Sequence, residues 1–416
     1  MRRARQRAFP FLRRKRVCTG HGTQLVRISG VSRMQIRSFP TSVAKVLAIV
    51  GVCRDGSAAR IAALAAISAF LICGTTPKAY AQSVGTGGMA LDGRPHPGSP
   101  ITGWTGNISP ADPYSAGPNM GAWITKAGMI HSRSEVAVGD VNGKMYVLGG
   151  YADGNVAQPL NEEYDPTSDT WRERAPLPQG ANHIAAVGLD GKLYAIGGFV
   201  EQNFHATADV WVYDPAKDAW TAAAPLPQPL GSMAVAAVGG VIHAIGGAGG
   251  TTIENRHTIS VHYIYDPKTN HWTESTPLPF PREHFNLIAY DGKLYAIGGR
   301  VENFSQNMQT VYSLDLHDKN ARWSALPLMP VARSGTQAAV LNGKIFVFGG
   351  EKFGGVFNVS EMFDPATQRW SELTPMPVGR HGTGAAVLNN MIYIPGGGPL
   401  NGGAAQTNAS QAFTYP

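Results

Sequence analysis

The chain of 416 residues contains 50 glycines and 29 prolines, a composition typical of turn-rich β proteins. Its formal net charge of +7 arises at one end, because residues 1–81 hold 15 of the 35 Lys and Arg residues and one of the 28 Asp and Glu residues. The other 20 basic and 27 acidic residues give residues 82–416 a net charge of −7, which argues against nucleic-acid binding there. All three cysteines, Cys18, Cys53 and Cys73, lie in the first segment, so the remainder has no disulfide framework, thiolate metal site or cysteine nucleophile.

The basic segment at residues 1–81 has the pattern of a secretory signal. A 13-residue apolar run, Ile61–Cys73, follows Arg54 and Arg60 and precedes Ala79-Tyr80-Ala81. A charged flank, a short apolar core and an Ala-x-Ala site predict cleavage after Ala81. Thirteen residues are too few to cross a bilayer, so we expect a secreted or periplasmic product with no stable membrane anchor. Import into an organelle is the alternative, because the segment is rich in Arg and nearly free of acidic residues.

Residues 82–121 are rich in Gly, Pro and Ser and predict a flexible leader. Beyond them an apolar strand that ends in a double glycine recurs six times. The six copies are Lys144–Gly150, Lys192–Gly198, Val241–Gly247, Lys293–Gly299, Lys344–Gly350 and Met391–Gly397. Their first glycines are 48, 49, 52, 51 and 47 residues apart. This period assigns residues 122–416 to one repeat domain.

Each repeat carries further markers at constant positions. A tryptophan stands 26 residues before the first glycine of every copy, at Trp123, Trp171, Trp220, Trp272, Trp323 and Trp370. Four units have an aromatic-Asp-Pro triplet seven residues before the next tryptophan. Dipeptides such as Asn142-Gly143 and Asp190-Gly191 suit the tight hairpins that join two antiparallel strands. Each unit therefore predicts four short strands, the last of which begins at the tryptophan.

A period near fifty residues with these glycines and tryptophans resembles the kelch repeat, one four-stranded blade of a β-propeller. The resemblance implies an all-β, six-bladed propeller. The last unit ends at Pro416 without a fourth strand, whereas Trp123 begins a fourth strand with no third strand before it. We therefore expect Ala122–Ala127 to close the last blade.

In the kelch proteins that this chain resembles, the inter-blade connections and the loops after the second strands share one face, at an end of the central channel. The resemblance therefore places the binding site at this channel mouth. Four units have an arginine ten residues after the tryptophan, and twelve residues after it stand Glu135, His183 and His284 in three units. The loops after the double glycines add aromatic and charged residues. The expected ligand-binding residues are Arg133, Glu135, Tyr151, His183, Phe199, Arg282, His284, Arg300, Arg333, Glu351 and Arg380.

Two interpretations of the four arginines stay open. The planar guanidinium groups of arginines beside aromatic rings can bind carboxylates, sugar rings or acidic peptide loops. The same arginines could instead bond inter-blade carbonyl groups or a buried acid such as Glu135, because structural ion-pair networks imitate sites.

The remaining motifs indicate little further chemistry. No two histidines after residue 81 have metal-ligand spacing within one strand or helix, so no metal and no cofactor are expected. His257 and His262 are expected at the surface, and His243 in the core. Galactose oxidase, also a kelch propeller, uses a copper-radical cofactor that needs a cysteine, so the lack of cysteine after residue 81 argues against that chemistry.

The leading hypothesis is an exported kelch-repeat binding protein without enzyme activity. Its expected ligand at the channel mouth is a carbohydrate or a protein. An anionic ligand is one of the options. The alternative is a sugar mutarotase or epimerase acting on an acidic sugar, because the six blades and the export signal agree with the periplasmic sialic-acid mutarotases. A purely structural role is the third hypothesis.

Overall fold

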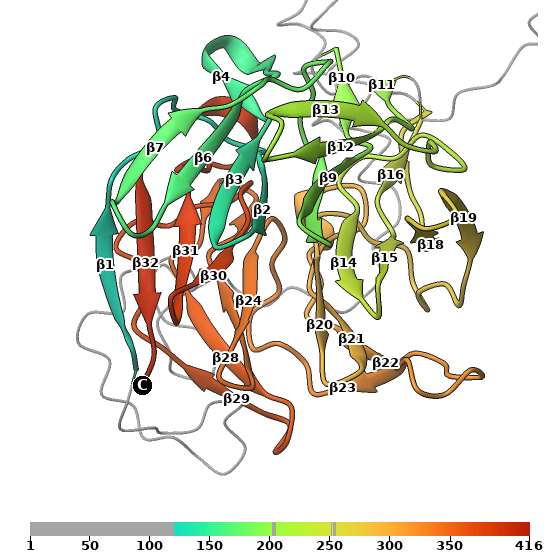
Figure 1. Ribbon diagram of the computed structural model, residues 1–416. Coiled ribbons are helices and arrows are strands. Elements are labelled where there is room, and N and C mark those ends of the chain that lie inside the picture. The colour runs from blue at the N-terminus through green and yellow to red at the C-terminus, as the bar shows by residue number, and fades with distance from the viewer. Residues whose placement is uncertain (1–119, 202–204, 251, 253–254) are drawn as a thin grey trace, which may run out of the picture. The chain divides into compact units, whose positions relative to one another are not determined.

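The computed structural model describes residues 120–201, 205–250, 252 and 255–416. The predicted presequence and nearly all of the predicted leader lie outside this part. The described residues form six four-stranded antiparallel sheets, arranged as blades around a central axis (Figure 1). The predicted all-β, six-bladed propeller is thus confirmed. The short 3-10 helices η2 (Asp153–Asn155), η4 (Phe304–Gln306) and η5 (Gly402–Ala404) lie in loops, and no helix in the described part could cross a membrane.

Blade 1 contains β2 (Ala137–Val141), β3 (Lys144–Leu148), β6 (Asn161–Asp165) and β7 (Thr170–Glu173). Blade 2 contains β8 (Ala185–Leu189), β9 (Lys192–Ile196), β12 (Val210–Asp214) and β13 (Ala219–Ala222). Blade 3 contains β14 (Ala234–Val238), β15 (Val241–Ile245), β18 (His262–Asp266) and β19 (His271–Glu274). Blade 4 contains β20 (Asn286–Tyr290), β21 (Lys293–Ile297), β22 (Val311–Asp315) and β23 (Ser324–Leu326).

Blade 5 contains β24 (Gln337–Leu341), β25 (Lys344–Phe348), β28 (Ser360–Asp364) and β29 (Arg369–Glu372). Blade 6 contains β30 (Ala386–Leu388), β31 (Met391–Pro395), β32 (Ser410–Thr414) and β1 (Ala122–Lys126). Strand β1 pairs antiparallel with β32, with Trp123 opposite Phe413.

Two-stranded hairpins follow the second strand in four blades. They are β4 (Tyr151–Ala152) with β5 (Val156–Ala157), β10 (Phe199–Val200) with β11 (His205–Ala206), β16 (Ala248–Gly249) with β17 (His257–Thr258), and β26 (Glu351–Lys352) with β27 (Gly355–Val356).

The double glycines permit close contact between adjacent blades. Gly149 has a φ of 60°, and a Cβ atom there would lie 2.4 Å from the carbonyl oxygen of Ala181, which leads into blade 2. A Cβ atom at Gly197 would similarly lie 2.2 Å from the carbonyl oxygen of Leu230. Since real Cβ atoms do not approach this closely, only glycine fits both the left-handed backbone and the contact.

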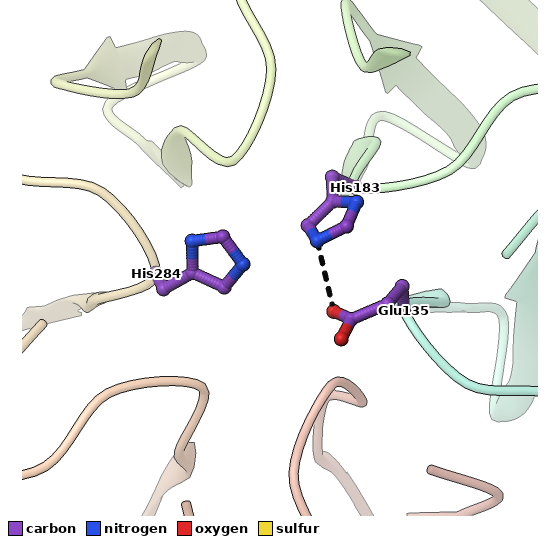
Figure 2. Close-up of side chains that lie close together, drawn as sticks. All are labelled: Glu135, His183 and His284. Atoms are coloured by element: carbon purple, nitrogen blue, oxygen red, sulfur yellow. Dashed lines mark ion pairs between the residues drawn. The ribbon is translucent and has the colours of Figure 1, made fainter. Parts of the chain in front are cut away.

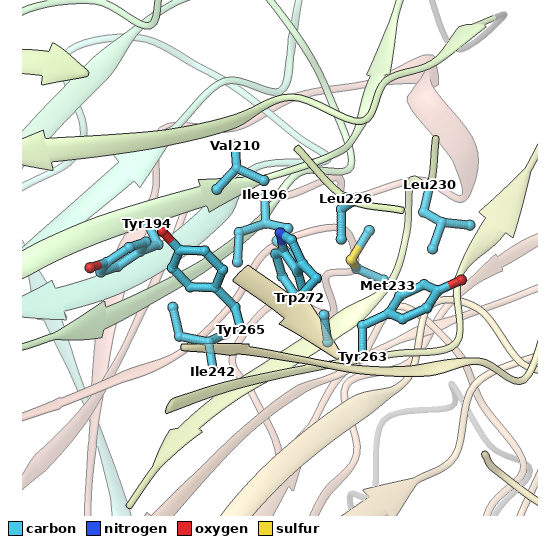
Figure 3. Close-up of a cluster of buried hydrophobic side chains, with 12 residues drawn as sticks. Tyr194, Ile196, Val210, Leu226, Leu230, Met233, Ile242, Tyr263, Tyr265 and Trp272 are labelled. Carbon is cyan, nitrogen blue, oxygen red and sulfur yellow. The ribbon is translucent and has the colours of Figure 1, made fainter. Parts of the chain in front are cut away.

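Apolar side chains fill the spaces between blades. In the cluster between blades 2 and 3, Tyr194 and Ile196 meet Tyr265 and Trp272, and all four side chains are buried (Figure 3). Full burial of one such side chain contributes roughly 1.5–3 kcal/mol. Similar clusters recur between other blades, so the core is divided around the ring instead of lying in one place.

The tryptophans connect each blade to the one before it. In every repeat the indole Nε1–H donates to the carbonyl oxygen four residues after the previous tryptophan. The six bonds are Trp171 to Ala127, Trp220 to Ala175, Trp272 to Ala224, Trp323 to Thr276, Trp370 to Pro327 and Trp123 to Thr374. A buried indole keeps its polar N–H paired in this way while its ring packs between blades.

One histidine lies where the sequence analysis did not expect it. His257 is exposed in β17, but His262 is 1% exposed at the start of β18, so its predicted surface position was wrong. The Nε2 atom of His262 lies 2.9 Å from Nδ1 of the buried His243. Burial lowers the pKa of both histidines to about 4. The variable loop ends before His262, which belongs to the buried third strand.

The innermost strands of the blades surround a central cavity of about 470 Å³. Small apolar residues of β2, β8, β14, β20, β24 and β30 provide most of its wall. Asp140 is the one charged residue in that wall. The side chains that line the cavity are therefore mainly apolar, and charged side chains are concentrated at the end where the innermost strands begin.

Candidate functional site at the channel mouth

Six equivalent residues, one before each innermost strand, form what we call the mouth belt. They are Glu135, His183, Ser232, His284, Gly335 and Gly382. From His183 to Gly382, the backbone N–H of each residue donates to the carbonyl oxygen of the belt residue before it, at 2.9–3.2 Å. The N–H of Val136 donates to the carbonyl oxygen of Gly382 and completes the circle. Continuous backbone bonding fixes the diameter of the channel mouth.

All six belt residues have left-handed backbone conformations. Glu135, His183, Ser232 and His284 have φ values of 53°, 51°, 54° and 52°, close to the 61° of Gly335 and Gly382. A residue with a Cβ atom is disfavoured there by roughly 1–2 kcal/mol. Four strained positions thus carry polar side chains where glycine would fit without strain, which is characteristic of functional sites.

Three of these side chains face one another at the centre of the belt (Figure 2). Nε2 of His183 lies 3.1 Å from Oε2 of Glu135, and the rings of His183 and His284 are 4.8 Å apart in an edge-on arrangement. The side chains of Glu135, His183 and His284 are only 4–7% exposed. They line a recess of about 120 Å³ between the mouth and the channel.

An ion-pair network extends from the belt into the surrounding loops. Its members in order of contact are Glu135, His381, Glu351, Arg300, Glu283 and Arg256, with contacts of 3.0, 3.3, 2.5, 3.1 and 2.8 Å. These three carboxylates and three basic groups balance when His381 is protonated. Each cation of the network already lies against a carboxylate, so the network concentrates charge without a large excess of one sign.

The contacts of Glu135 and His381 keep both groups charged. Burial alone would raise the pKa of Glu135, but His183 and His381 outweigh it and hold that pKa well below its usual range. Burial likewise opposes charge on His381, but Glu135 and Glu351 raise its pKa to about 9. The pair is therefore an imidazolium and a carboxylate at neutral pH.

His284 has the opposite protonation behaviour. Burial and the Arg300 guanidinium lower its pKa to about 4, despite the nearby Glu283. Its Nε2 lies 3.1 Å from Nη2 of Arg300, and its Nδ1 lies 3.4 Å from Oε1 of Glu283. His284 is therefore a neutral imidazole at pH 7, with Nε2 as a hydrogen-bond acceptor.

Two aromatic residues predicted for the site contact His183. The rings of Tyr151 and Phe199 lie 6.0 and 5.7 Å from its imidazole, both edge-on. The guanidinium of Arg256 lies over Phe199, 4.4 Å from the ring centre. Of the residues expected to bind ligand, the structure thus gathers seven around the mouth: Glu135, Tyr151, His183, Phe199, His284, Arg300 and Glu351.

The other four expected residues point into the blades. Arg133, Arg282, Arg333 and Arg380 are at most 1% exposed. Arg133 donates to the carbonyl oxygens of Gly149 and Leu160 and to Glu162, all in its own blade. The other three bond carbonyl groups near the double glycine of their own blades in the same manner. The structure places these arginines in the structural role, with partners inside one blade and not between blades.

Several residues of the site were not among those expected to bind ligand. Ser232 belongs to the mouth belt, and Glu283 and His381 stand eleven residues after a tryptophan, between the two positions considered. Arg256 lies in a variable loop. The sequence signal for Glu283 and His381 is their shared repeat position, which forms a backbone bridge to the loop after the double glycine.

Comparisons with known proteins agree with this architecture. The family model described as the KLHDC2/KLHL20/DRC7 Kelch-repeats domain matches residues 124–299 and 232–411. The solved structure of YjhT superposes with a TM-score of 0.60 at 17% identity, covering 68% of this chain and 95% of that chain. At this identity, the similarity to YjhT supports the fold alone.

Curated relatives match over shorter segments. Kelch-like protein 33 of Homo sapiens is 33% identical over 26% of this chain and 20% of its own length. Kelch-like protein terF of Aspergillus terreus is 34% identical over 24% of this chain and 22% of its own. Kelch repeat and BTB domain-containing protein 8 of Xenopus tropicalis is 39% identical over 22% of this chain and 15% of its own. The matches therefore cover under a quarter of these relatives.

Proposed function

The chain belongs to the family of kelch-repeat domains, and from this premise we propose that its propeller binds a protein partner on the face that carries the channel mouth. Kelch propellers typically bind proteins. The geometry supports the proposal in two ways, through exposed apolar residues on that face and through the small size of the mouth recess.

The distribution of exposed apolar side chains carries the proposal. The described residues include nine large apolar side chains that are exposed, and seven of them lie in the two loop sets of the mouth face. They are Ile130, Val156, Phe280, Leu328, Phe353, Val378 and Leu400. Phe353, at the tip of the hairpin between β26 and β27, is 83% exposed. Exposed apolar residues gathered on one face are characteristic of interaction surfaces.

The mouth recess is small for a free small molecule. Its volume is about 120 Å³, whereas ligand pockets usually measure roughly 300–1,000 Å³. A recess of this size can take one side chain from a protein whose main contact is with the surrounding loops. The polar network would fix the orientation of that side chain, and the apolar loop tips would supply contact area.

A photo-crosslinking experiment tests the proposal. We expect a photoreactive amino acid at Phe353 to crosslink a partner in the native host, and the same probe at Lys217 to capture none. Lys217 is the matched control because its side chain is 79% exposed and it lies in the turn between β12 and β13, at the opposite end of the strands.

The captured partner must then bind in purified form. We expect Phe353→Ser to weaken that binding by about tenfold or more, as loss of a buried aromatic anchor does, while Lys217→Ser leaves the affinity unchanged. Equal crosslinking from both positions, or equal affinity of both variants, would contradict the assignment of this face.

A second candidate function is mutarotation of an acidic sugar, with non-catalytic carbohydrate binding as its simpler form. The observation that favours it is the pairing of the Glu135 carboxylate with His183 beside the neutral His284, since acid and base groups within reach can transfer protons. Anomer interconversion of acidic sugars, followed by NMR, tests this candidate. Enzyme-dependent exchange that His284→Gly abolishes would favour it, and an unchanged spontaneous rate would eliminate it.

Export is part of the same proposal. The Ala79-Tyr80-Ala81 motif supports cleavage after Ala81, but the presequence lies outside the described residues. Mass spectrometry of the mature N-terminus checks this. We expect a chain that begins at Gln82 in a secreted or periplasmic fraction, and recovery of the protein from an organelle would favour the import alternative.

A further inference from the structure

Glu135, His183 and His284 combine two imidazoles and a carboxylate at the centre of the mouth belt (Figure 2). Their potential ligand atoms all lie within 4.8 Å of one another. Zn²⁺ and its first-row neighbours accept this donor set. We propose that the mouth belt binds a divalent first-row transition-metal ion through these three side chains. This site goes beyond protein recognition and differs from the expectation of no metal, because blades 1, 2 and 4 each contribute one ligand.

The surroundings of His183 orient it as a metal ligand. Its Nδ1 atom lies 2.5 Å from Oδ1 of Asn182. The amide of Asn182 is held in this orientation because its Nδ2 donates to the carbonyl oxygen of Phe199 at 3.1 Å. The proton on Nδ1 therefore points at the amide oxygen, and Nε2 faces Oε2 of Glu135 at 3.1 Å. This nitrogen and oxygen face each other at the place that a metal ion would occupy.

His284 has a similar but looser arrangement. Its Nδ1 lies 3.4 Å from Oε1 of Glu283, the residue before it, as Asn182 precedes His183, but it makes no hydrogen bond among the described residues. A metal-binding histidine usually directs its other ring nitrogen to a carboxylate or carbonyl oxygen, which fixes its tautomer and ring orientation. In both histidines the preceding residue supplies the oxygen near Nδ1, and both rings face the centre of the belt (Figure 2).

Metal binding requires two small changes. Zinc–ligand distances of about 2.0–2.2 Å place tetrahedral donors roughly 3.4 Å apart, so the three donors must converge slightly from their present separation. Nη2 of Arg300 must also release Nε2 of His284, which it now contacts at 3.1 Å. Arg300 keeps its contacts with Glu283 and Glu351 when it does so.

The remaining coordination position has room for water or for a donor from a bound molecule. Gly335 and Gly382 bring no side chain to the other side of the belt. Ser232 lies between the two histidines in the belt, and its buried Oγ has no hydrogen-bond partner among the described residues. This hydroxyl could bond a metal-bound water. Three protein ligands and one open position are the pattern of sites that bind an exchangeable molecule.

Calorimetric titration of Zn²⁺ into the chelator-treated full chain tests the proposal. The variants are His183→Gly and His284→Gly, because glycine fits the left-handed backbone at these positions. Asn142→Gly is the matched control, because it makes the same kind of change at an exposed hairpin residue with a φ of 51°, outside the belt. We expect each histidine variant to weaken Zn²⁺ binding by about tenfold or more and the asparagine variant to stay within about threefold of the parent. Mg²⁺ should give no comparable binding, because it prefers oxygen ligands.

Melting curves establish that each variant is folded before its titration is interpreted. An anomalous-scattering peak between Glu135, His183 and His284 in zinc-soaked crystals would place the ion. The proposal is overturned if Zn²⁺ does not bind, or if both histidine variants bind it as the parent does. Because the titration contains no partner protein, its failure is separate from any failure of the interaction at Phe353.

Discussion

Arg133 and Arg282 occupy equivalent places in blades 1 and 4. Replacing each with methionine separates the stability that comes from hydrogen bonds to backbone carbonyl groups from the stability that comes from a buried ion pair. Both side chains are fully buried, and each donates to the first glycine carbonyl of its blade's pair. The partners of their Nη2 atoms differ, and Arg133 alone also bonds the Val147 carbonyl oxygen. Nη2 of Arg133 lies 2.9 Å from the Glu162 carboxylate, whereas Nη2 of Arg282 donates to the Thr310 hydroxyl at 2.9 Å.

The expected losses of stability follow from these partners. Arg282→Met leaves a glycine carbonyl short of a donor but no buried charge, so we expect a loss of about 1–3 kcal/mol. Arg133→Met also removes the cation from a Glu162 side chain that is 0% exposed, and breaking a buried ion pair typically costs about 3–5 kcal/mol. The backbone N–H of Ile130 still bonds Glu162 at 2.7 Å, which favours the lower end of that range.

Equilibrium urea unfolding followed by tryptophan fluorescence measures both variants, with a shift in midpoint at unchanged slope as the readout. The double variant Arg133→Met/Glu162→Leu should recover most of the loss, because a buried pair can be replaced by apolar residues at little cost. If both single variants are as stable as the parent but bind the partner more weakly, the arginines contact ligand and this reasoning is refuted. Equal losses in the two variants would show that the ion pair between Arg133 and Glu162 contributes nothing to stability.

Three further predictions concern the belt and the buried histidines. The pKa of His381 rises from 6.5 to about 9 on folding, so its contribution to stability is complete below pH 6.5 and lost as pH rises toward 9. The free energy of unfolding of the parent should therefore fall over this pH range, and His381→Gln should remove this dependence on pH. The pKa of His243 falls from 6.5 to about 4 on folding, so the free energy of unfolding should decline as pH drops through that range. His243→Phe should make this decline smaller. If the variant has the same acid profile as the parent, His243 is not a cause of the decline. Gly382→Ala places a Cβ atom 2.7 Å from the Glu135 carboxylate, whereas the nearest atom for Gly335→Ala is 3.4 Å away. Thermal melting should therefore show a greater loss for Gly382→Ala, beyond the roughly 1–2 kcal/mol of backbone strain expected at either position; equal losses would mean that the contact with Glu135 is unimportant.

The blade architecture could be predicted because its signals are local. Hairpin dipeptides, strand residues and the spacing from Tyr164 to Trp171 act within one unit, so each repeat indicates a blade without information from the others. The same local pattern shows which loops meet at the channel mouth. Seven of the eleven residues expected to bind ligand indeed lie there.

The direction of side chains within those loops could not be predicted in the same way. Arg133 and Glu135 are two residues apart and both precede an innermost strand, yet the arginine turns into its blade and the glutamate faces the axis. The left-handed backbone at Glu135, with a φ of 53°, redirects the chain between them. A strained conformation carried by a residue other than glycine has no reliable sequence signal, so the interpretation of the arginines had to stay open.

Local repeat patterns therefore specify the number of blades and the loops that carry the candidate site. Which side chains meet depends on how the blades pack around the ring. Glu135, His183 and His284 come from three blades and have no mutual spacing that suggests a shared site. They approach because the propeller ring closes and the belt of backbone hydrogen bonds fixes the distance across the mouth. Their proximity depends on the relative positions of whole blades, which no local pattern in one repeat specifies.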